Sequence, residues 1–252
     1  MLRNYTQEKQ GVRDFYCSLY KNQTLENTIN LIDKYSQLNH GEMSIQTALD
    51  LLDTFVDPSD PDLDMPNSVH AYQTAEKIRK RYPKDKQLQL TGLIHDLGKV
   101  LFNFNEPNYF IVGDTFVLGS EIPNCVPYYD TIENPGKYAE YGIYKPHSGL
   151  ESLILSYGHD EYLYQVLMGN RDKHKLDKKY MDIIRYHSFY PWHTGGAYNH
   201  LMVPGDSYIL SNVRMFNQFD LYSKPDSKNI SSAVKNYYKK LITDYFPVDL
   251  KW

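Results

Sequence analysis

The dipeptide His95-Asp96 lies inside an apolar stretch of the chain, Thr91-Gly-Leu-Ile-His-Asp-Leu-Gly-Lys99. A carboxylate in an apolar segment is costly to bury unless a cation, a metal ion or several hydrogen bonds compensate its charge. A chain that carries this segment must therefore fold so that other segments supply those partners. Candidates with suitable side chains occur in separate regions of helical pattern, at His70, His159, His187 and Asp220.

Together these four histidines and two carboxylates form a set of nitrogen and oxygen ligands without a thiolate. Such a set favours iron, manganese or zinc, and its size predicts a two-metal site. Ligands at the ends of different helices can converge inside a bundle, where helical proteins build their metal sites. The other histidines are expected to have structural roles, the last two near the rim of the cavity: His40, His147, His174, His193 and His200.

Lys99 follows His95 by four residues, so the two side chains point roughly the same way if the segment is helical. A nearby metal charge would lower the pKa of Lys99, which could then act as a base or as a donor to a developing alkoxide. The simpler alternative is a surface lysine at a helix C-terminus, favoured by the helix dipole.

Helical periodicity dominates the chain and predicts one mainly α domain over residues 1–252. Helices are expected over 8–21, 24–37, 44–56, 69–81, 86–102, 149–156, 161–169, 178–189, 206–222 and 230–246. Residues 103–145 are rich in Pro, Gly, Asn and Tyr, and they predict a long irregular segment with a short hairpin near residues 109–117. A connection of this length inside a compact domain is more often functional than idle.

Composition excludes several classes of protein. The net charge of −4 argues against binding to nucleic acid, which needs a basic surface. Cys17 and Cys125 are far apart and form no CxxC pair, which argues against a disulfide framework and favours a reducing, cytoplasmic location. The N-terminus lacks the apolar core of a signal peptide, and no apolar run is long enough to predict a membrane-spanning helix.

Several runs around the candidate ligands resemble the myo-inositol oxygenase family, a divergent branch of the HD-domain superfamily. These runs are Asp60–His70, Leu93–Lys99, Val112–Phe116, Gly158–Gln165, His187–Gly196 and Phe216–Tyr222. The resemblance extends from Arg3-Asn-Tyr-Thr6 to Trp252, and the run His187–Gly196, taken with the others, is very specific. It implies a single HD-domain-like helical bundle.

The resemblance implies an oxygenase that cleaves the ring of myo-inositol with O2 as co-substrate and gives D-glucuronate, the first step of inositol catabolism. The implied cofactor is a pair of iron ions in the mixed-valent Fe(II)/Fe(III) state. By similarity, one iron is bound by His70, His95 and Asp220. The other is bound by His159 and His187, and Asp96 bridges the two. Asp96 and Lys99 are the implied catalytic residues.

The same resemblance implies contacts with a small polyol, whose hydroxyl groups both donate and accept hydrogen bonds. The implied substrate-binding residues are Arg3, Asp57, Pro58, Ser59, Lys99, Gly113, Asp114, His187, Ser188 and Lys224. Because Arg3 is so near the N-terminus, its match implies that residues 1–40 contain a lid that closes over the site together with Tyr16. A monomer without a nucleic-acid or membrane partner is expected.

Three alternatives stay open on the residues alone. An HD-type metal-dependent phosphohydrolase would need cations for phosphate, and Arg3, Lys99 and Lys224 could supply them. A related diiron oxygenase could act on another polyol or on a phosphonate. A helical scaffold or ligand-binding protein without turnover would keep the fold, but it has no need for costly buried charges.

Overall fold

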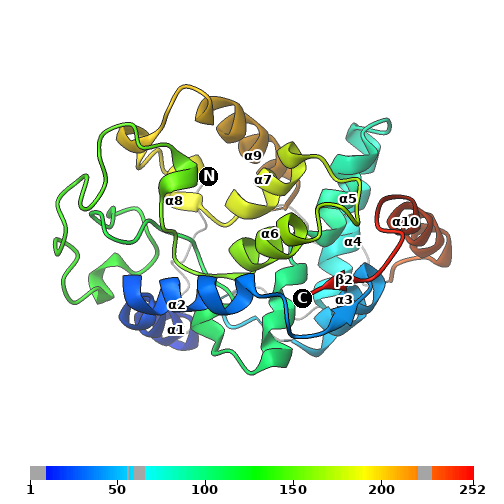
Figure 1. Ribbon diagram of the computed structural model, residues 1–252, viewed down its shortest axis with the longest axis horizontal. Coiled ribbons are helices and arrows are strands. Elements are labelled where there is room, and N and C mark those ends of the chain that lie inside the picture. The colour runs from blue at the N-terminus through cyan, green and yellow to red at the C-terminus, as the bar shows by residue number, and fades with distance from the viewer. Residues whose placement is uncertain (1–9, 56, 60–65, 221–228) are drawn as a thin grey trace.

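A computed structural model describes residues 10–55, 57–59, 66–220 and 229–252 of the chain, and these residues form a mainly α protein, as predicted (Figure 1). The α-helices are α1 (Gln10–Asn22), α2 (Leu25–Ser36), α3 (Ile45–Leu51), α4 (Asn67–Arg81), α5 (Lys86–Ile94), α6 (His159–Gly169), α7 (Lys178–Tyr186), α8 (Tyr190–His193), α9 (Asp206–Asp220) and α10 (Ser232–Tyr245). Short 3-10 helices are η1 (Leu52–Thr54), η2 (Leu97–Phe104), η3 (Asn108–Phe110), η4 (Tyr129–Thr131), η5 (Leu150–Ser152) and η6 (Asn199–Leu201).

The centre of the bundle consists of α4, α5, α6, α7 and α9. Helix α4 packs on α5, α6 packs on α7 and on η2, and α7 packs on α9. Figure 1 shows α7 and α9 beside each other, with α10 at the opposite edge from the loops. The main hydrophobic cluster draws buried side chains from the whole described chain, from Val12 to Trp252. One domain over residues 1–252, with helices and a lid in 1–40, stays a prediction.

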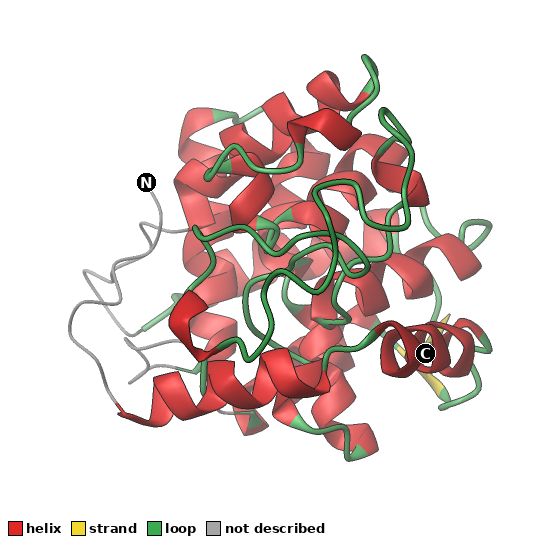
Figure 2. Ribbon diagram, turned by 90° about the vertical axis from the view of Figure 1, so that its left-hand side faces the viewer, coloured by secondary structure: helices red, strands yellow, loops and turns green. Residues whose placement is uncertain are grey.

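The irregular segment lies at one end of the molecule and covers the helices there (Figures 1 and 2). The prediction of a hairpin near 109–117 is wrong. Asn108–Phe110 form η3, and Val117 makes an isolated antiparallel bridge with Leu155. The helix expected over 149–156 is also wrong. Only Leu150–Ser152 are helical, since the residues that follow extend to pair with 116–118.

The helix expected over 86–102 divides at His95-Asp96 into α5 and η2. A close approach of two backbones explains the break. A Cβ atom on Gly98 would lie 1.8 Å from the carbonyl oxygen of His159, so η2 packs directly against the first turn of α6 only because residue 98 is glycine. The break places Asp96 between the two helical segments.

A two-stranded antiparallel sheet joins β1 (Glu42–Met43) to β2 (Leu250–Lys251). These strands have no signal in the sequence, because each is too short to show a period and they lie far apart in the chain. The indole Nε1 of Trp252 also donates to the carbonyl of Met43 at 3.0 Å, which fixes the C-terminal residue in the core. Within the described residues, no helix has the length and apolar character needed to cross a membrane.

Candidate metal centre

The six candidate ligands lie at or beside helix ends in the centre of the bundle. They are His70 in the first turn of α4, His95 at the C-cap of α5, Asp96 before η2, His159 at the start of α6, His187 at the C-cap of α7 and Asp220 at the end of α9. Their side chains converge although the segments are far apart in sequence. Two groups that could each hold a metal ion share one residue: His70, His95 and Asp96, and Asp96, His159 and His187.

Backbone carbonyls orient two of the imidazoles in the same way. His95 and His187 each cap a helix C-terminus, where carbonyl groups lack partners inside the helix. In each case Nδ1 donates to the carbonyl three residues earlier, Gly92 at 3.0 Å and Ile184 at 2.7 Å. A carbonyl oxygen cannot donate, so in a neutral ring the proton is on Nδ1 and Nε2 carries a lone pair, as in histidine ligands of metals.

The Nδ1 of His159 also donates to a backbone carbonyl, although this histidine lies at a helix N-terminus. Its backbone N–H and its Nδ1 both donate to the carbonyl of Ile111, at 2.8 Å each. Its Nε2 lies 3.1 Å from the Nε2 of His187. Two neutral imidazoles with their protons on Nδ1 present lone pairs to each other at this distance, which is repulsive unless a cation lies between them. The donor set therefore fits a metal ion.

The carboxylate of Asp96 directs one oxygen toward each group of histidines. Its Oδ1 lies 3.1 Å from Nε2 of His159 and 3.7 Å from Nε2 of His187. Its Oδ2 lies 3.6 Å from Nε2 of His95. Burial opposes ionisation, but Lys99 and His95 outweigh it and hold the pKa of Asp96 well below its usual range. An ionised carboxylate placed in this way can bridge two cations.

Asp220 completes the group that contains His70 and His95. Its Oδ1 lies 2.9 Å from Nε2 of His70 and 3.2 Å from Nε2 of His95. Burial opposes ionisation here too, yet the imidazoles of His95 and His70 hold the pKa of Asp220 well below its usual range. The side chain of His70 is 26% exposed and that of His95 only 1%, so solvent meets this group at His70.

The ring of Phe216 links the two groups from α9, one turn before Asp220. Its centroid lies 5.4 Å from that of the His95 ring and 6.4 Å from that of the His187 ring, both in edge-to-face contact. The ring thereby limits how far either imidazole can rotate. This role of Phe216 could not be predicted from the sequence, because an apolar residue on an amphipathic helix has no chemical signature of it.

Lys99 lies between two buried carboxylates rather than on the surface. Its Nζ is 2.9 Å from Oδ2 of Asp57 and 3.0 Å from Oδ2 of Asp96. Burial lowers the pKa of Lys99, but the two carboxylates outweigh burial and raise it above its usual value. The lowered pKa expected from the sequence is therefore not what the described residues produce. They favour a charged ammonium group that donates hydrogen bonds.

Residues 57–59 form a closed turn beside Lys99. Oδ1 of Asp57 accepts hydrogen bonds from the backbone N–H of Ser59 at 2.9 Å and from its hydroxyl at 2.6 Å. Pro58 lies within this turn. Burial raises the pKa of Asp57, but Lys99 and Ser59 outweigh it and lower that pKa overall. The turn thus brings the three predicted residues of this segment next to the Lys99–Asp96 pair.

Gly113, Asp114 and Ser188 lie on a second side of the centre. The backbone N–H of Thr115 donates to the carbonyl of Ser188 at 2.9 Å, and the Ser188 hydroxyl lies 3.3 Å from Nε2 of His187. Gly113 has a φ of +108°, a conformation that favours glycine, and a Cβ there would lie 2.4 Å from Leu19 of α1.

The hydroxyl of Tyr16 reaches this second side from α1. It donates to Oδ1 of Asp114 at 3.1 Å, and the tyrosine is fully buried. This contact joins the N-terminal helix to the predicted substrate-binding segment. Arg3 and Lys224, also predicted to contact substrate, lie outside the described residues.

The two histidines expected near the rim have different positions. His193 is 1% exposed and lies behind the ligands, where its Nε2 donates to the carbonyl of His187 at 2.9 Å, so a rim position is wrong for it. His200 is partly exposed and lies 3.6 Å from the carboxylate of Glu140. The difference arises because α8 turns His193 inward toward α9.

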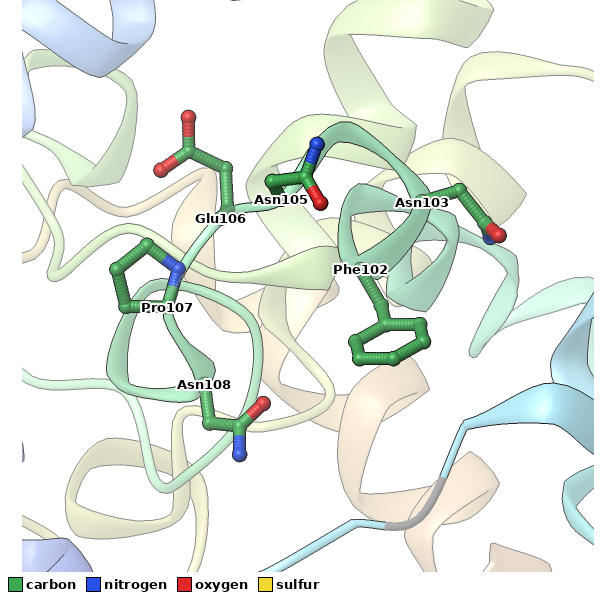
Figure 3. Close-up of a pocket in the computed structure, with 6 residues that line it drawn as sticks. All are labelled: Phe102, Asn103, Asn105, Glu106, Pro107 and Asn108. Carbon is green, nitrogen blue, oxygen red and sulfur yellow. The ribbon is translucent and has the colours of Figure 1, made fainter.

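Figure 3 shows an open depression on the surface beside the end of η2. It is lined by Phe102, Asn103, Asn105, Glu106, Pro107 and Asn108. The carboxylate of Glu106 accepts hydrogen bonds from Lys34 at 2.5 Å and Tyr35 at 2.8 Å, which ties it to α2. None of its six lining residues is a candidate ligand.

Comparison with known proteins agrees with this centre. The family model described as Myo-inositol oxygenase matches residues 9–252. The chain is 42% identical to the inositol oxygenase of Rattus norvegicus over 260 residues, which cover 99% of this chain and 90% of the rat protein. It is also 42% identical to a probable inositol oxygenase of Oryza sativa subsp. japonica, covering 99% of this chain and 84% of the rice protein. For the inositol oxygenase of Danio rerio the identity is 41%, over 94% of this chain and 87% of the fish protein. With nearly its whole length matched in this way, the chain belongs to the myo-inositol oxygenase family.

Proposed function

We propose that this chain is an inositol oxygenase that cleaves the ring of myo-inositol with O2 and releases D-glucuronate. One observation carries the proposal beyond family membership. His95 and His159 direct their Nε2 atoms toward opposite oxygens of one buried carboxylate, Asp96, which is common to the two groups that could each hold a metal ion. Such an arrangement suits two metal ions that share a bridge and act on one substrate.

The proposed cofactor is a pair of iron ions in the Fe(II)/Fe(III) state. His70, His95 and Asp220 would hold one iron, and His159 and His187 the other, with Asp96 between them. The buried carboxylates of Asp96 and Asp220 lie within this set, and buried carboxylates favour the binding of cations. When bound, iron supplies Lewis acidity toward substrate hydroxyls and electrons for the reduction of O2.

Lys99 is the proposed donor to the substrate. The described residues engage two of its three N–H groups through Asp57 and Asp96, and both contacts fix the ammonium beside the bridging carboxylate. A substrate hydroxyl that lay beside Asp96 would meet this ammonium. By stabilising the negative charge that develops on that oxygen, Lys99 would favour loss of its proton.

The substrate would lie between the two sides of the centre. The turn at Asp57 and Ser59 forms one side, and Asp114 and Ser188 form the other. Carboxylates and hydroxyls suit a neutral polyol, which both donates and accepts hydrogen bonds. Arg3 and Lys224 are proposed as further contacts by resemblance, and Tyr16 as part of the lid.

A phosphohydrolase is less well supported by this geometry. Phosphate esters need uncompensated cationic groups around the transferred phosphoryl group. Lys99, the described lysine at the centre, is instead paired with two carboxylates. These would repel a phosphate, whereas they accept hydrogen bonds from a polyol.

The proposal is tested by loading the purified chain with Fe(II) without oxygen and oxidising it partly. O2 uptake is then measured with myo-inositol, and the product is identified by mass spectrometry. We expect one D-glucuronate for each O2 consumed. Fully loaded protein that consumes no O2 and forms no glucuronate would contradict the proposal, and phosphate release from a phosphate ester would support the hydrolase.

A monomer in the cytoplasm is also proposed. Both cysteines are free thiols, Cys17 exposed and Cys125 partly buried, as a reducing compartment allows. Light scattering coupled to gel filtration tests the monomer directly. A measured mass of twice that of the chain would show a dimer and contradict the proposed monomer.

A further inference from the structure

His193 is a buried histidine that is not one of the proposed ligands. It is the last residue of α8, is 1% exposed, and follows His187 by one short turn. Its Nε2 lies 2.9 Å from the carbonyl oxygen of His187. Since a carbonyl only accepts, Nε2 carries the proton and donates it, and Nδ1 of the neutral ring is left as an acceptor.

The ring of His193 contacts both its own segment and α9. The hydroxyl of Thr194 lies 2.8 Å from Nδ1, and the side-chain amide nitrogen of Asn217 lies 3.2 Å from Nδ1 and 3.5 Å from Nε2, over the face of the ring. Arg214 adds a hydrogen bond from Nε to the carbonyl of His193 at 2.5 Å. These contacts attach both the ring and the backbone of His193 to α9.

The two partners on α9 lie on the face that leads to Asp220. Arg214, Asn217 and Asp220 follow one another at intervals of three residues, which places them along one side of the helix. The imidazole of His193 thus joins the backbone of His187 to the helix that carries Asp220. His187 and Asp220 are proposed ligands of different metal ions.

We propose that His193 is a positioning residue that fixes the separation between the two metal-binding groups. The inference rests on the proposed metal centre and extends it to a residue that touches neither metal. Its Nε2 donates to the His187 segment, while Asn217 over its ring and Arg214 at its carbonyl join it to α9. A side chain that lacks the Nε2 donor lets the two segments move independently.

The test compares metal binding of His193→Phe, His193→Gln and the unmodified chain. Fe(II) is titrated without oxygen, and the loaded pair is followed by electron paramagnetic resonance. Loss of an outer hydrogen bond to a ligand usually weakens metal affinity about 10- to 100-fold. We expect a loss of that size for His193→Phe, with an altered resonance. Because glutamine offers one donor and one acceptor, His193→Gln should restore most of the affinity.

His174→Phe is the matched control. His174 is also buried, its Nε2 donates to the carbonyl of Leu167 at 2.8 Å, and its Nδ1 accepts from the backbone of Leu176, but it contacts no proposed ligand. It should lose stability without losing metal affinity. Equal losses of affinity in His174→Phe and His193→Phe, or none in His193→Phe, would overturn the proposal.

A milder variant covers the case in which His193→Phe does not fold. Asn217→Leu removes the donor from α9 and keeps the bond between His193 and His187. It should weaken metal binding less than His193→Phe and alter the resonance in the same direction, and unchanged binding would overturn the inference. If the unmodified chain and these variants all bind two irons equally well, the role inferred for His193 fails and the proposed function stands. If the unmodified chain binds no metal pair, the proposed function fails with it.

Discussion

The two halves of the proposed metal centre use the same kinds of ligand but are held differently. In the half with His159 and His187, the side chains are 6% and 4% exposed and both Nδ1 atoms donate to backbone carbonyls. In the half with His70 and Asp220, the imidazole of His70 is 26% exposed and contacts a carboxylate 150 residues away in the chain. The first half is enclosed and the second is open.

This difference suggests that one half of the centre fixes the positions of the ligands and the other half is accessible to solvent. In the enclosed half, both imidazoles are oriented by backbone carbonyls, which favours a nearly fixed geometry. The open half has one imidazole of this kind, His95, but it also depends on the contact between the side chains of His70 and Asp220 from α4 and α9, and His70 is partly exposed. We therefore expect the enclosed half to set the positions of the reacting groups, and the open half to exchange its metal more easily.

The largest expected effect is the loss of metal from both halves of the centre. Asp96→Ala deletes the carboxylate that both halves share, so iron content should fall from about two ions per chain toward none. Iron is measured by a colorimetric chelator after gel filtration. Asp206→Ala is the control, since Asp206 is equally buried and accepts from the backbone N–H groups of Leu150 and Val203. Retention of an intact iron pair in Asp96→Ala would refute the bridge.

The next largest expected effect is the loss of metal from one half of the centre while the other half retains its ion. Asp220→Asn should remove the iron of the open half and His159→Gln that of the enclosed half, each leaving about one ion per chain. The two variants serve as controls for each other, and the spectra of the remaining ions should differ. If either variant loses both ions, the halves are not independent and the comparison is broken.

A smaller structural change should affect turnover and leave the metals in place. Lys99→Met keeps the length of the side chain but removes the ammonium group beside Asp57 and Asp96, and kcat should fall at least about 100-fold. Iron content should stay near that of the unmodified chain. Lys178→Met is the control, because Lys178 also pairs with two carboxylates but is half exposed and lies at the opposite end of α7 from His187. Normal turnover in Lys99→Met would exclude the proposed donor.

The smallest expected effect is kinetic. A soluble iron chelator should remove the two ions in two phases, with the faster phase belonging to the half that contains His70. Absorbance of the chelate follows the reaction without oxygen. In Asp220→Asn the fast phase should be absent. A single phase in the unmodified chain would mean that the exposure of His70 does not control release.

The parts of the fold that follow from local pattern were predictable. Periodic apolar residues predicted the helices near their observed bounds, including α4 and α9. The errors lie where distant segments decide the outcome. Leu155 extends because it pairs with Val117, and the expected helix over 86–102 breaks because Gly98 packs on the backbone of His159. No periodicity in one segment encodes the approach of another.

The candidate site was predictable in its residue types but not in its hydrogen bonds. The spacing and family resemblance named the ligands, and the structure brings the described ones together. The carbonyl acceptors of His95 and His187 could be found only from helix ends, which are the least certain bounds in a sequence. The role inferred for His193 depends on a contact with α9 and has no signature in its own segment.

The contact between Gly98 and His159 has a mechanical consequence. Because the two main chains already touch where a methyl group would overlap, η2 cannot move closer to α6. The separation of these two backbones, which carry Asp96 and His159, therefore has a hard lower limit and a softer upper one. A ligand that pulled the two segments together would meet more resistance than one that pushed them apart.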